Sequence, residues 1–221
     1  LGKTGRKSEA ADAERKAVVL SPLDADAHYN LGVTLQDLGR FEEAESCYGQ
    51  AIVLEPDLAE AHNNYGNMLK ELGRLDEAEA SCNQAIALKP DYAEAHNNLG
   101  NTLKELGRLD EAKVSYKQAI VLKPDLATAY WNLYGSQETI QNAENWIDKC
   151  LEADENHVEA RLTKAALRFY QGDRNSFDEL MQSELKQHPY SRSFAWVFSL
   201  PNLPELHFEK WHFFDAIVNK S

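Results

Sequence analysis

The hydrophobic and polar positions between residues 57 and 124 follow one pattern that occurs twice in succession. Residues 57–90 and 91–124 agree at 26 of 34 positions without a gap. From residue 59 to residue 72, apolar side chains recur every three or four residues, which is the spacing of one face of an α-helix. A second apolar face follows before residue 90. The pattern therefore predicts two amphipathic helices in each unit.

Glycine, acidic and proline residues mark the ends of these helices. Gly73 tolerates a positive φ and is predicted to end the first helix. Asp76 and Glu77 are well placed against the positive N-terminal end of the second helix. Pro90 ends that helix, and Asp91 is predicted to be the N-cap of the next one. The two helices form an antiparallel hairpin, which is too thin to bury its own faces and becomes stable by stacking on its neighbours.

The same period extends towards the N-terminus. A turn glycine, an alanine of the second helix and a closing proline each recur every 34 residues. These residues are Gly5, Gly39, Gly73 and Gly107, Ala10, Ala44, Ala78 and Ala112, and Pro22, Pro56, Pro90 and Pro124. A fixed period of this length is typical of a solenoid. Residues 23–124 hold three regular repeats, whereas 1–22 match only a second helix, so we expect a fragment of a longer array.

The register changes after the last of these prolines. A shift of 31 residues restores it, so 125–189 is predicted to hold two degenerate repeats, 125–155 and 156–189. The first of them is expected to lack a turn near 135–141. Residues 190–221 leave the pattern and are rich in Phe and Trp. We predict that they form either a cap on the array or a junction to a following domain.

This arrangement resembles the tetratricopeptide repeat family. The resemblance rests on an apolar residue followed by a glycine in each first helix, and on alanines and larger side chains in each second helix. These residues are Leu31/Gly32, Tyr65/Gly66 and Leu99/Gly100, then Ala44, Ala78 and Ala112, Tyr48, Cys82 and Tyr116, and Ala51, Ala85 and Ala119. The resemblance implies an all-α fold, a right-handed α-solenoid (superhelix) of antiparallel helical hairpins.

Two finer resemblances concern what lies beyond the repeats. The sequences N-N-L-G-N and L-G-R-L-D-E-A are most similar to the repeats that precede protein O-GlcNAc transferases. The stretch LPNLPELHFEKWHFFDAIV is similar to the junction between repeats and a methyltransferase domain in some bacterial proteins. Each implies a catalytic domain outside this chain.

Composition and charge restrict the partners. The chain is 43% hydrophobic and carries a formal net charge of −13, so it should fold and has no electrostatic reason to bind nucleic acid. No apolar run approaches the roughly 20 residues that a membrane helix needs, so no membrane partner is expected. Cys47, Cys82 and Cys150 form no C-x-x-C pair and are predicted to be reduced thiols of a cytoplasmic protein.

A series of asparagines in the first helices is the main candidate for a binding site. Two sets lie three residues apart, on one helix face. They are Asn30, Asn64, Asn98 and Asn132, and Asn67 and Asn101. An Asn amide offers a donor and an acceptor, so it can pair with any peptide backbone. In the transferases that the repeats resemble, such an asparagine ladder holds an extended peptide in the concave groove. The alternative is that Asn is simply the usual residue on a solvated face.

The neighbouring side chains indicate the kind of partner. The residues before the Asn series are Tyr29, Asn63, Asn97 and Trp131, and they are predicted to line the same groove. The acidic residues Asp26, Glu60 and Glu94 lie nearby. A neutral or basic segment therefore suits the face better than an acidic one, and a clamp for a C-terminal carboxylate is not expected.

The sequence offers no metal or catalytic site. His28, His62 and His96 occur once per repeat, whereas metal ligands must converge to within about 2.1 Å of one ion. They are predicted to pack between helices. There is no G-x-S-x-G, P-loop or G-x-G-x-x-G motif, so no catalytic residue and no cofactor is predicted.

We therefore predict a non-catalytic protein–protein interaction scaffold that binds an extended peptide or protein segment through an asparagine ladder. The alternative is the recruiting arm of a larger enzyme, a methyltransferase or a glycosyltransferase. The apolar side of the N-terminal helix expected at 5–20 further predicts self-association.

Overall fold

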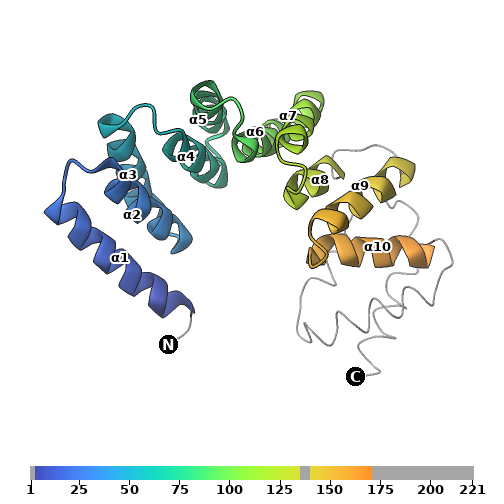
Figure 1. Ribbon diagram of the computed structural model, residues 1–221, viewed down its shortest axis with the longest axis horizontal. Helices are drawn as coiled ribbons and strands as arrows, with labels where there is room; N and C mark the ends of the chain where they lie inside the picture. Colours follow the sequence, from blue (N-terminus) through green and yellow to red (C-terminus); the bar gives the residue numbers. More distant parts are fainter. Residues whose placement is uncertain (1–2, 135–139, 171–221) are drawn as a thin grey trace. The chain divides into compact units, whose positions relative to one another are not determined.

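The computed structural model describes residues 3–134 and 140–170, and every regular element in these ranges is an α-helix (Figure 1). The chain divides into unit 1, Leu1–Lys123, and unit 2, Pro124–Ser221. Unit 1 contains α1 (Lys3–Leu20), α2 (Ala25–Asp37), α3 (Phe41–Leu54), α4 (Ala59–Glu71), α5 (Leu75–Leu88), α6 (Ala93–Glu105) and α7 (Leu109–Leu122). Unit 2 contains α8 (Ala127–Tyr134), α9 (Ile140–Ala153) and α10 (Val158–Tyr170). The predicted all-α fold is confirmed.

The helix ends follow the predicted glycines, with one correction at the N-caps. Gly73, after α4, has a φ of 74°, and its N–H donates to the Lys70 carbonyl at 2.9 Å. Asp91 is not the N-cap of α6, because the helix begins one residue later and Tyr92 takes that place without a side-chain cap bond. A capping aspartate occurs instead at α2, where Asp24 accepts from the Ala27 N–H.

In unit 1, the two helices of a repeat meet at the glycine within the first helix. A Cβ atom on Gly66 would lie 2.9 Å from the Cys82 Sγ and 3.1 Å from the Ala78 carbonyl oxygen. A Cβ atom on Gly100 would lie 2.5 Å from the ring of Tyr116. Real side-chain atoms do not approach this closely, so only glycine allows the observed packing of the hairpin.

Stacking of the hairpins builds one curved layer of helix pairs in unit 1. Helix α4 contacts α2, α3, α5 and α6. Figure 1 shows α4 on the inner side of the arc of unit 1 and α5 on its outer side. By the 34-residue period, α2, α4 and α6 are the first helices and share the inner side, which we call the first-helix face. Unit 1 is therefore an α-solenoid of the predicted kind.

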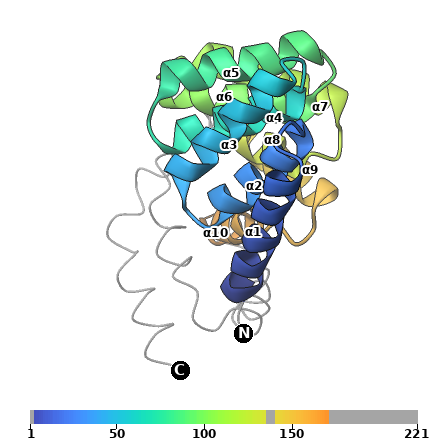
Figure 2. The same ribbon diagram turned by 90° about the vertical axis from the view of Figure 1, so that its left-hand side faces the viewer.

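The stack of unit 1 begins with a single helix. Helix α1 packs on α2 in the place that a second helix takes in the following repeats. Figure 2, which views the molecule from this side, shows α1 in front of the other helices of unit 1. Three apolar side chains near its C-terminal end, Val19, Leu20 and Leu23, stay 79%, 83% and 82% exposed.

Unit 2 is a second packed group of helices. Helix α9 contacts both α8 and α10. Ile147 and Cys150 of α9 and Ala160 of α10 are fully buried there. The turn predicted to be missing near 135–141 falls mostly outside the described residues. The second degenerate repeat beyond residue 170 and the cap or junction predicted for 190–221 also lie outside them.

Candidate functional site

A chain of hydrogen bonds between side chains runs across the three first helices of unit 1. The Asn98 Nδ2 of α6 donates to the Asn63 Oδ1 of α4 at 2.9 Å. The Asn63 Nδ2 donates to the Oδ1 of its neighbour Asn64 at 3.1 Å. The Asn64 Nδ2 donates to the Tyr29 hydroxyl of α2 at 2.9 Å. We call these four residues the amide chain. It links the repeats to one another, a role that the sequence pattern did not predict.

The predicted site residues of unit 1 differ in how deeply they are buried. Asn63 and Asn97 are 3% and 8% exposed, so they lie beneath the first-helix face. Asn64 and Asn98 are half-buried, and Asn30 is exposed. The second N–H of the Asn63 amide points to the Tyr92 hydroxyl at 3.4 Å, so both of its N–H groups and its oxygen have protein partners.

The second asparagine set is held in two different ways. Asn101 accepts a hydrogen bond of 2.9 Å from the hydroxyl of Tyr116, which reaches it from the second helix α7. Cys82 takes the place of this tyrosine in the preceding repeat and is too short to do the same. Asn67 donates instead to Glu71 of its own helix at 3.2 Å. Asn101 is therefore held by a side chain of the second helix, whereas Asn67 is held by a residue of its own helix.

The remaining predicted residues, Trp131 and Asn132, belong to α8 of unit 2. Both are half-buried. The Trp131 ring lies 5.1 Å from the Tyr134 ring and 5.4 Å from the His157 ring, measured between centroids. This aromatic cluster holds Trp131 within unit 2.

The charges beside the amide chain differ between repeats. The Lys89 Nζ lies 3.1 Å from Glu60 and 4.8 Å from the centroid of the Tyr92 ring. The next repeat has the same pair, Lys123 and Glu94, at 2.7 Å. In the first repeat the two corresponding positions hold Asp26 and Glu55, which are both acidic.

These charges also act on the tyrosine that ends the amide chain. Burial raises the pKa of the Tyr29 hydroxyl, and the charges of Glu60 and Asp26 raise it further against the hydrogen bond from Asn64. The hydroxyl therefore keeps its proton at neutral pH. A backbone hydrogen bond and the hydrogen bond from Lys89 lower the pKa of Glu60, which stays ionised.

A second network with the same period consists of charged residues at the starts of the second helices. The guanidinium group of Arg74 donates to Glu77 at 2.6 Å and to Glu45 of the preceding repeat at 2.7 Å. Arg108 donates at 2.7 Å to both Glu111 and Glu79 in the same way. We call these contacts the arginine ladder.

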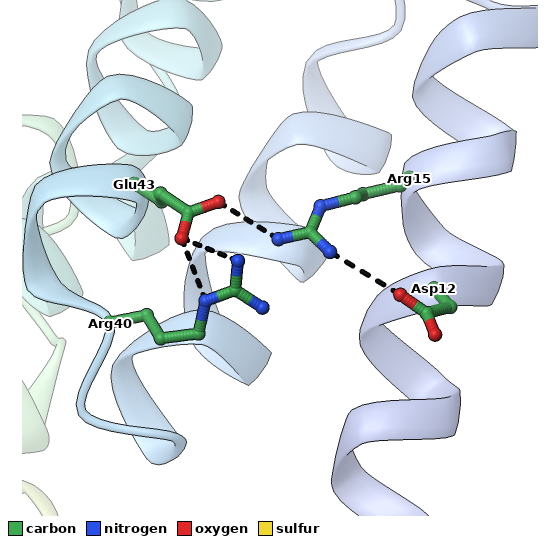
Figure 3. A network of polar contacts seen from close by, with 4 residues as sticks. All are labelled: Asp12, Arg15, Arg40 and Glu43. Carbon is green, nitrogen blue, oxygen red and sulfur yellow. Dashed lines mark hydrogen bonds and ion pairs between the residues drawn. The ribbon is translucent and has the colours of Figure 1, made fainter.

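The arginine ladder changes at its N-terminal end. Arg40 donates to Glu43 at 2.7 Å, and the second donor to this carboxylate is Arg15 of α1 at 2.8 Å (Figure 3). Arg15 also contacts Asp12 of its own helix at 3.3 Å. By the 34-residue period, the acid that would contact Arg40 should stand 34 residues before Glu45. That position holds the buried Ala11, so Arg15 links α1 to α3 instead.

The repeated histidines bind backbone groups. The Nε2 atoms of His28, His62 and His96 lie 3.0, 3.0 and 3.1 Å from the carbonyl oxygens of Pro22, Pro56 and Pro90. Each histidine thereby joins the start of a first helix to the end of the preceding second helix. Within the described ranges, no group of three His, Cys, Asp or Glu residues is arranged to hold a metal ion. No helix there is long and apolar enough to span a bilayer.

Comparison with known families assigns the repeats. Family models described as tetratricopeptide or TPR repeat match residues 25–58, 47–80, 66–107 and 100–133. Residues 25–133 therefore contain tetratricopeptide repeats, a fold that is typically non-catalytic. No curated protein matches the sequence. The similarity to repeats of O-GlcNAc transferases and to a methyltransferase junction stays a prediction.

Solved structures share the fold. Pseudomonas aeruginosa PilF has a TM-score of 0.70 and 22% identity, over 85% of this chain and 86% of PilF. YrrB, described as a TPR protein with an unusual peptide-binding site, has a TM-score of 0.57 and 20% identity, over 81% of this chain and 94% of YrrB. The first TPR domain of Spaghetti (RPAP3), bound to an HSP90 peptide, has a TM-score of 0.50 and 27% identity, over 51% of this chain and 89% of that domain.

Proposed function

We propose that the first-helix face of unit 1 binds an extended peptide or protein segment through its backbone, without chemistry. The observation that carries the proposal is the set of open hydrogen-bonding groups on the amide chain. The Asn98 Oδ1 accepts no hydrogen bond from the described residues, and the Asn64 amide keeps a second N–H. Such groups suit the alternating C=O and N–H groups of an extended chain.

The spacing of the helices fits this kind of ligand. Packed helices lie about 8–10 Å apart, and an extended peptide rises about 3.3 Å per residue. One amide of the ladder would then meet the ligand about every three residues. Among the structural neighbours, the RPAP3 domain was solved with a bound peptide, which makes the same class of ligand reasonable for this chain.

The charge of the face favours a basic segment over an acidic one. In two repeats a lysine neutralises the glutamate of the first helix, at Glu60 and Glu94. In the first repeat, Asp26 and Glu55 make no ion pair with the described residues, so a lysine or arginine of the partner would supply the missing positive charge. Tyr29 lies beside this position and would contact the same part of the ligand.

Peptide selection tests the proposal directly. A displayed library of 12-residue peptides is selected on the purified chain, and the affinity of the best binder is measured for Asn64→Ala and Asn98→Ala. Each variant should bind about fivefold to tenfold more weakly, because each loses one or two hydrogen bonds to the peptide.

The control for this experiment is Asn83→Ala, which changes an exposed asparagine of α5. It should bind like the unaltered chain. Equal affinity of all three folded variants would show that Asn64 and Asn98 do not contribute to peptide binding. Selection of acidic peptides would contradict the charge preference.

A second candidate function is pairing of two copies through α1. Val19 and Leu20 are exposed and line, with Arg15 and Lys16, an open hollow of ≈ 380 Å³ on α1. An exposed apolar group beside basic side chains fits a second copy of this acidic chain. Light scattering over a dilution series should show a dimer that Leu20→Lys abolishes, whereas Val53→Lys on α3 leaves it intact. A monomer at every concentration would exclude this pairing.

A further inference from the structure

The amide chain has a direction. From α6 to α2, Asn98 donates to Asn63 of α4, Asn63 donates to its neighbour Asn64, and Asn64 donates to the Tyr29 hydroxyl of α2. Asn63 is the only one of the four that is nearly completely buried, at 3% exposed. It receives one bond from α6 and passes another to the face of α4. Asn98 is therefore joined to Asn64 and Tyr29 through a residue that a ligand does not reach.

We propose that Asn63 is a positioning residue of the peptide-binding face, and that a bound segment is read by the two open ends of the amide chain. The Tyr29 hydroxyl donates to a main-chain carbonyl of the ligand, and the Asn98 Oδ1 accepts a main-chain N–H. This inference rests on the proposed function, because it names how the same face orients its contacts.

The hydrogen-bonding capacity of each end supports this assignment. The Tyr29 oxygen already accepts the Asn64 amide, so its own O–H is left to donate. The raised pKa of Tyr29 keeps that proton in place at neutral pH. The Asn98 amide is turned towards α4 by its bond to Asn63, which leaves the Oδ1 to accept. The chain thus presents a donor on α2 and an acceptor on α6.

Burial explains why Asn63 fixes these orientations. A half-exposed carboxamide can turn over at little cost, because water replaces its partners. Asn63 cannot turn over in this way, since its N–H groups face Asn64 and Tyr92 while its Oδ1 faces Asn98. Reversal would place like groups against each other at a buried site, where an unmade hydrogen bond is costly. Chains of hydrogen bonds also strengthen one another when their dipoles align.

A double-mutant cycle on ligand affinity separates positioning from general support of the fold. The probe is the tightest 12-residue peptide selected on the unaltered chain, and binding is measured at a temperature where circular dichroism shows every variant folded. Asn63→Ala should weaken binding about fivefold, although the residue does not touch the ligand. The double variant Asn63→Ala/Asn98→Ala should bind no more weakly than Asn98→Ala alone, because Asn63 acts through Asn98. Full additivity of the two losses would overturn the proposal.

The ends of the amide chain are tested by removing one ligand atom at a time. A set of peptides with single backbone esters lacks one N–H each. One ester should weaken binding to the unaltered chain and have no effect on Asn98→Ala. Tyr29→Phe removes only the hydroxyl and should also weaken binding. If no ester position depends on Asn98, the assigned acceptor is wrong.

A measurement without ligand keeps the inference testable on its own. In nuclear magnetic resonance spectra, the side-chain amide protons of Asn64 and Asn98 should be well dispersed and protected from hydrogen exchange. Asn63→Ala should remove that protection at both residues, and Asn83→Ala should not. Unchanged Asn64 and Asn98 signals in Asn63→Ala would refute the positioning role even if no peptide binds. Failure to select any peptide, with the expected signals present, would instead refute the proposed function alone.

Discussion

The amide chain and the arginine ladder both connect one repeat to the next, yet their side chains differ in charge and in burial. The amide chain is neutral and passes through Asn63, which is nearly buried. The arginine ladder is charged, and the side chains of Arg74 and Glu77 are 36% and 57% exposed. Both follow the 34-residue period of the sequence. The difference lies in what water does when a contact is lost.

Burial decides how much each network contributes. Water and salt compete with an exposed ion pair, so such pairs contribute about 0–1 kcal/mol. Removal of a buried amide leaves its partners unpaired, which costs about 1–3 kcal/mol. The shorter and more numerous contacts of the arginine ladder are therefore the weaker ones. The first-helix face is held by neutral bonds, and this leaves Asp26 and Glu55, which make no ion pair with the described residues, to select a partner.

Loss of the packing that both networks need should have the largest effect. Gly100→Val places a side chain against the ring of Tyr116, where even a Cβ atom would lie 2.5 Å away. The hydroxyl of Tyr116 also donates a hydrogen bond to Asn101, so the substitution disturbs the hairpin and the first-helix face together. We expect a loss of about 3 kcal/mol in the free energy of unfolding, measured by urea denaturation.

The control for this prediction is another glycine of the same chain. A Cβ atom on Gly49, within α3, meets nothing within 4 Å. Gly49→Ala should therefore raise stability by up to about 1 kcal/mol, since alanine is the better helix former. Equal destabilisation by both substitutions would show that close packing at Gly100 is not the cause.

The period of the sequence was enough to predict the hairpins and the turn at Gly73. These features follow from the spacing of residues along a single repeat. The bonds of the amide chain could not be predicted from the period, because Asn63 and Asn98 belong to different repeats and their bond depends on how the hairpins stack. Burial of Asn63 has the same origin. The N-cap was misplaced because Asp91 precedes the helix by one residue more than a cap does.

Asn63→Ala should have the next largest effect on stability. Its removal leaves the Asn98 Nδ2 and the Asn64 Oδ1 without their partners. We expect a loss of about 1–3 kcal/mol that does not depend on salt, because the groups are neutral. Urea denaturation at 0.05 M and 1 M salt measures both properties. A cost below that of Asn83→Ala, or a strong salt dependence, would contradict the account of the amide chain.

Arg74→Ala should cost less, although it breaks more contacts. The arginine loses ion pairs of 2.7 Å to Glu45 and 2.6 Å to Glu77, and all three side chains are substantially exposed. We expect a smaller loss in the free energy of unfolding than for Asn63→Ala, and one that shrinks further at 1 M salt. The same urea experiment detects it. If Arg74→Ala destabilised the chain more than Asn63→Ala, the ranking of the two networks would be reversed.

The smallest effect should be the share of acid sensitivity that comes from one carboxylate of the arginine ladder. The hydrogen bond and charge of Arg74 lower the pKa of Glu77 below its ordinary value of 4.5. A carboxylate with a lowered folded pKa stabilises the fold above about pH 4.5, and this contribution is lost as the pH falls through the folded pKa. Glu77→Gln removes it, so the midpoint of urea denaturation should fall less between pH 7 and pH 3 in this variant than in the unaltered chain. The amide chain contains no group that titrates in this range, so Asn63→Ala should keep the full pH dependence. If the midpoint of urea denaturation fell equally with pH in Glu77→Gln and in the unaltered chain, water would already replace this ion pair.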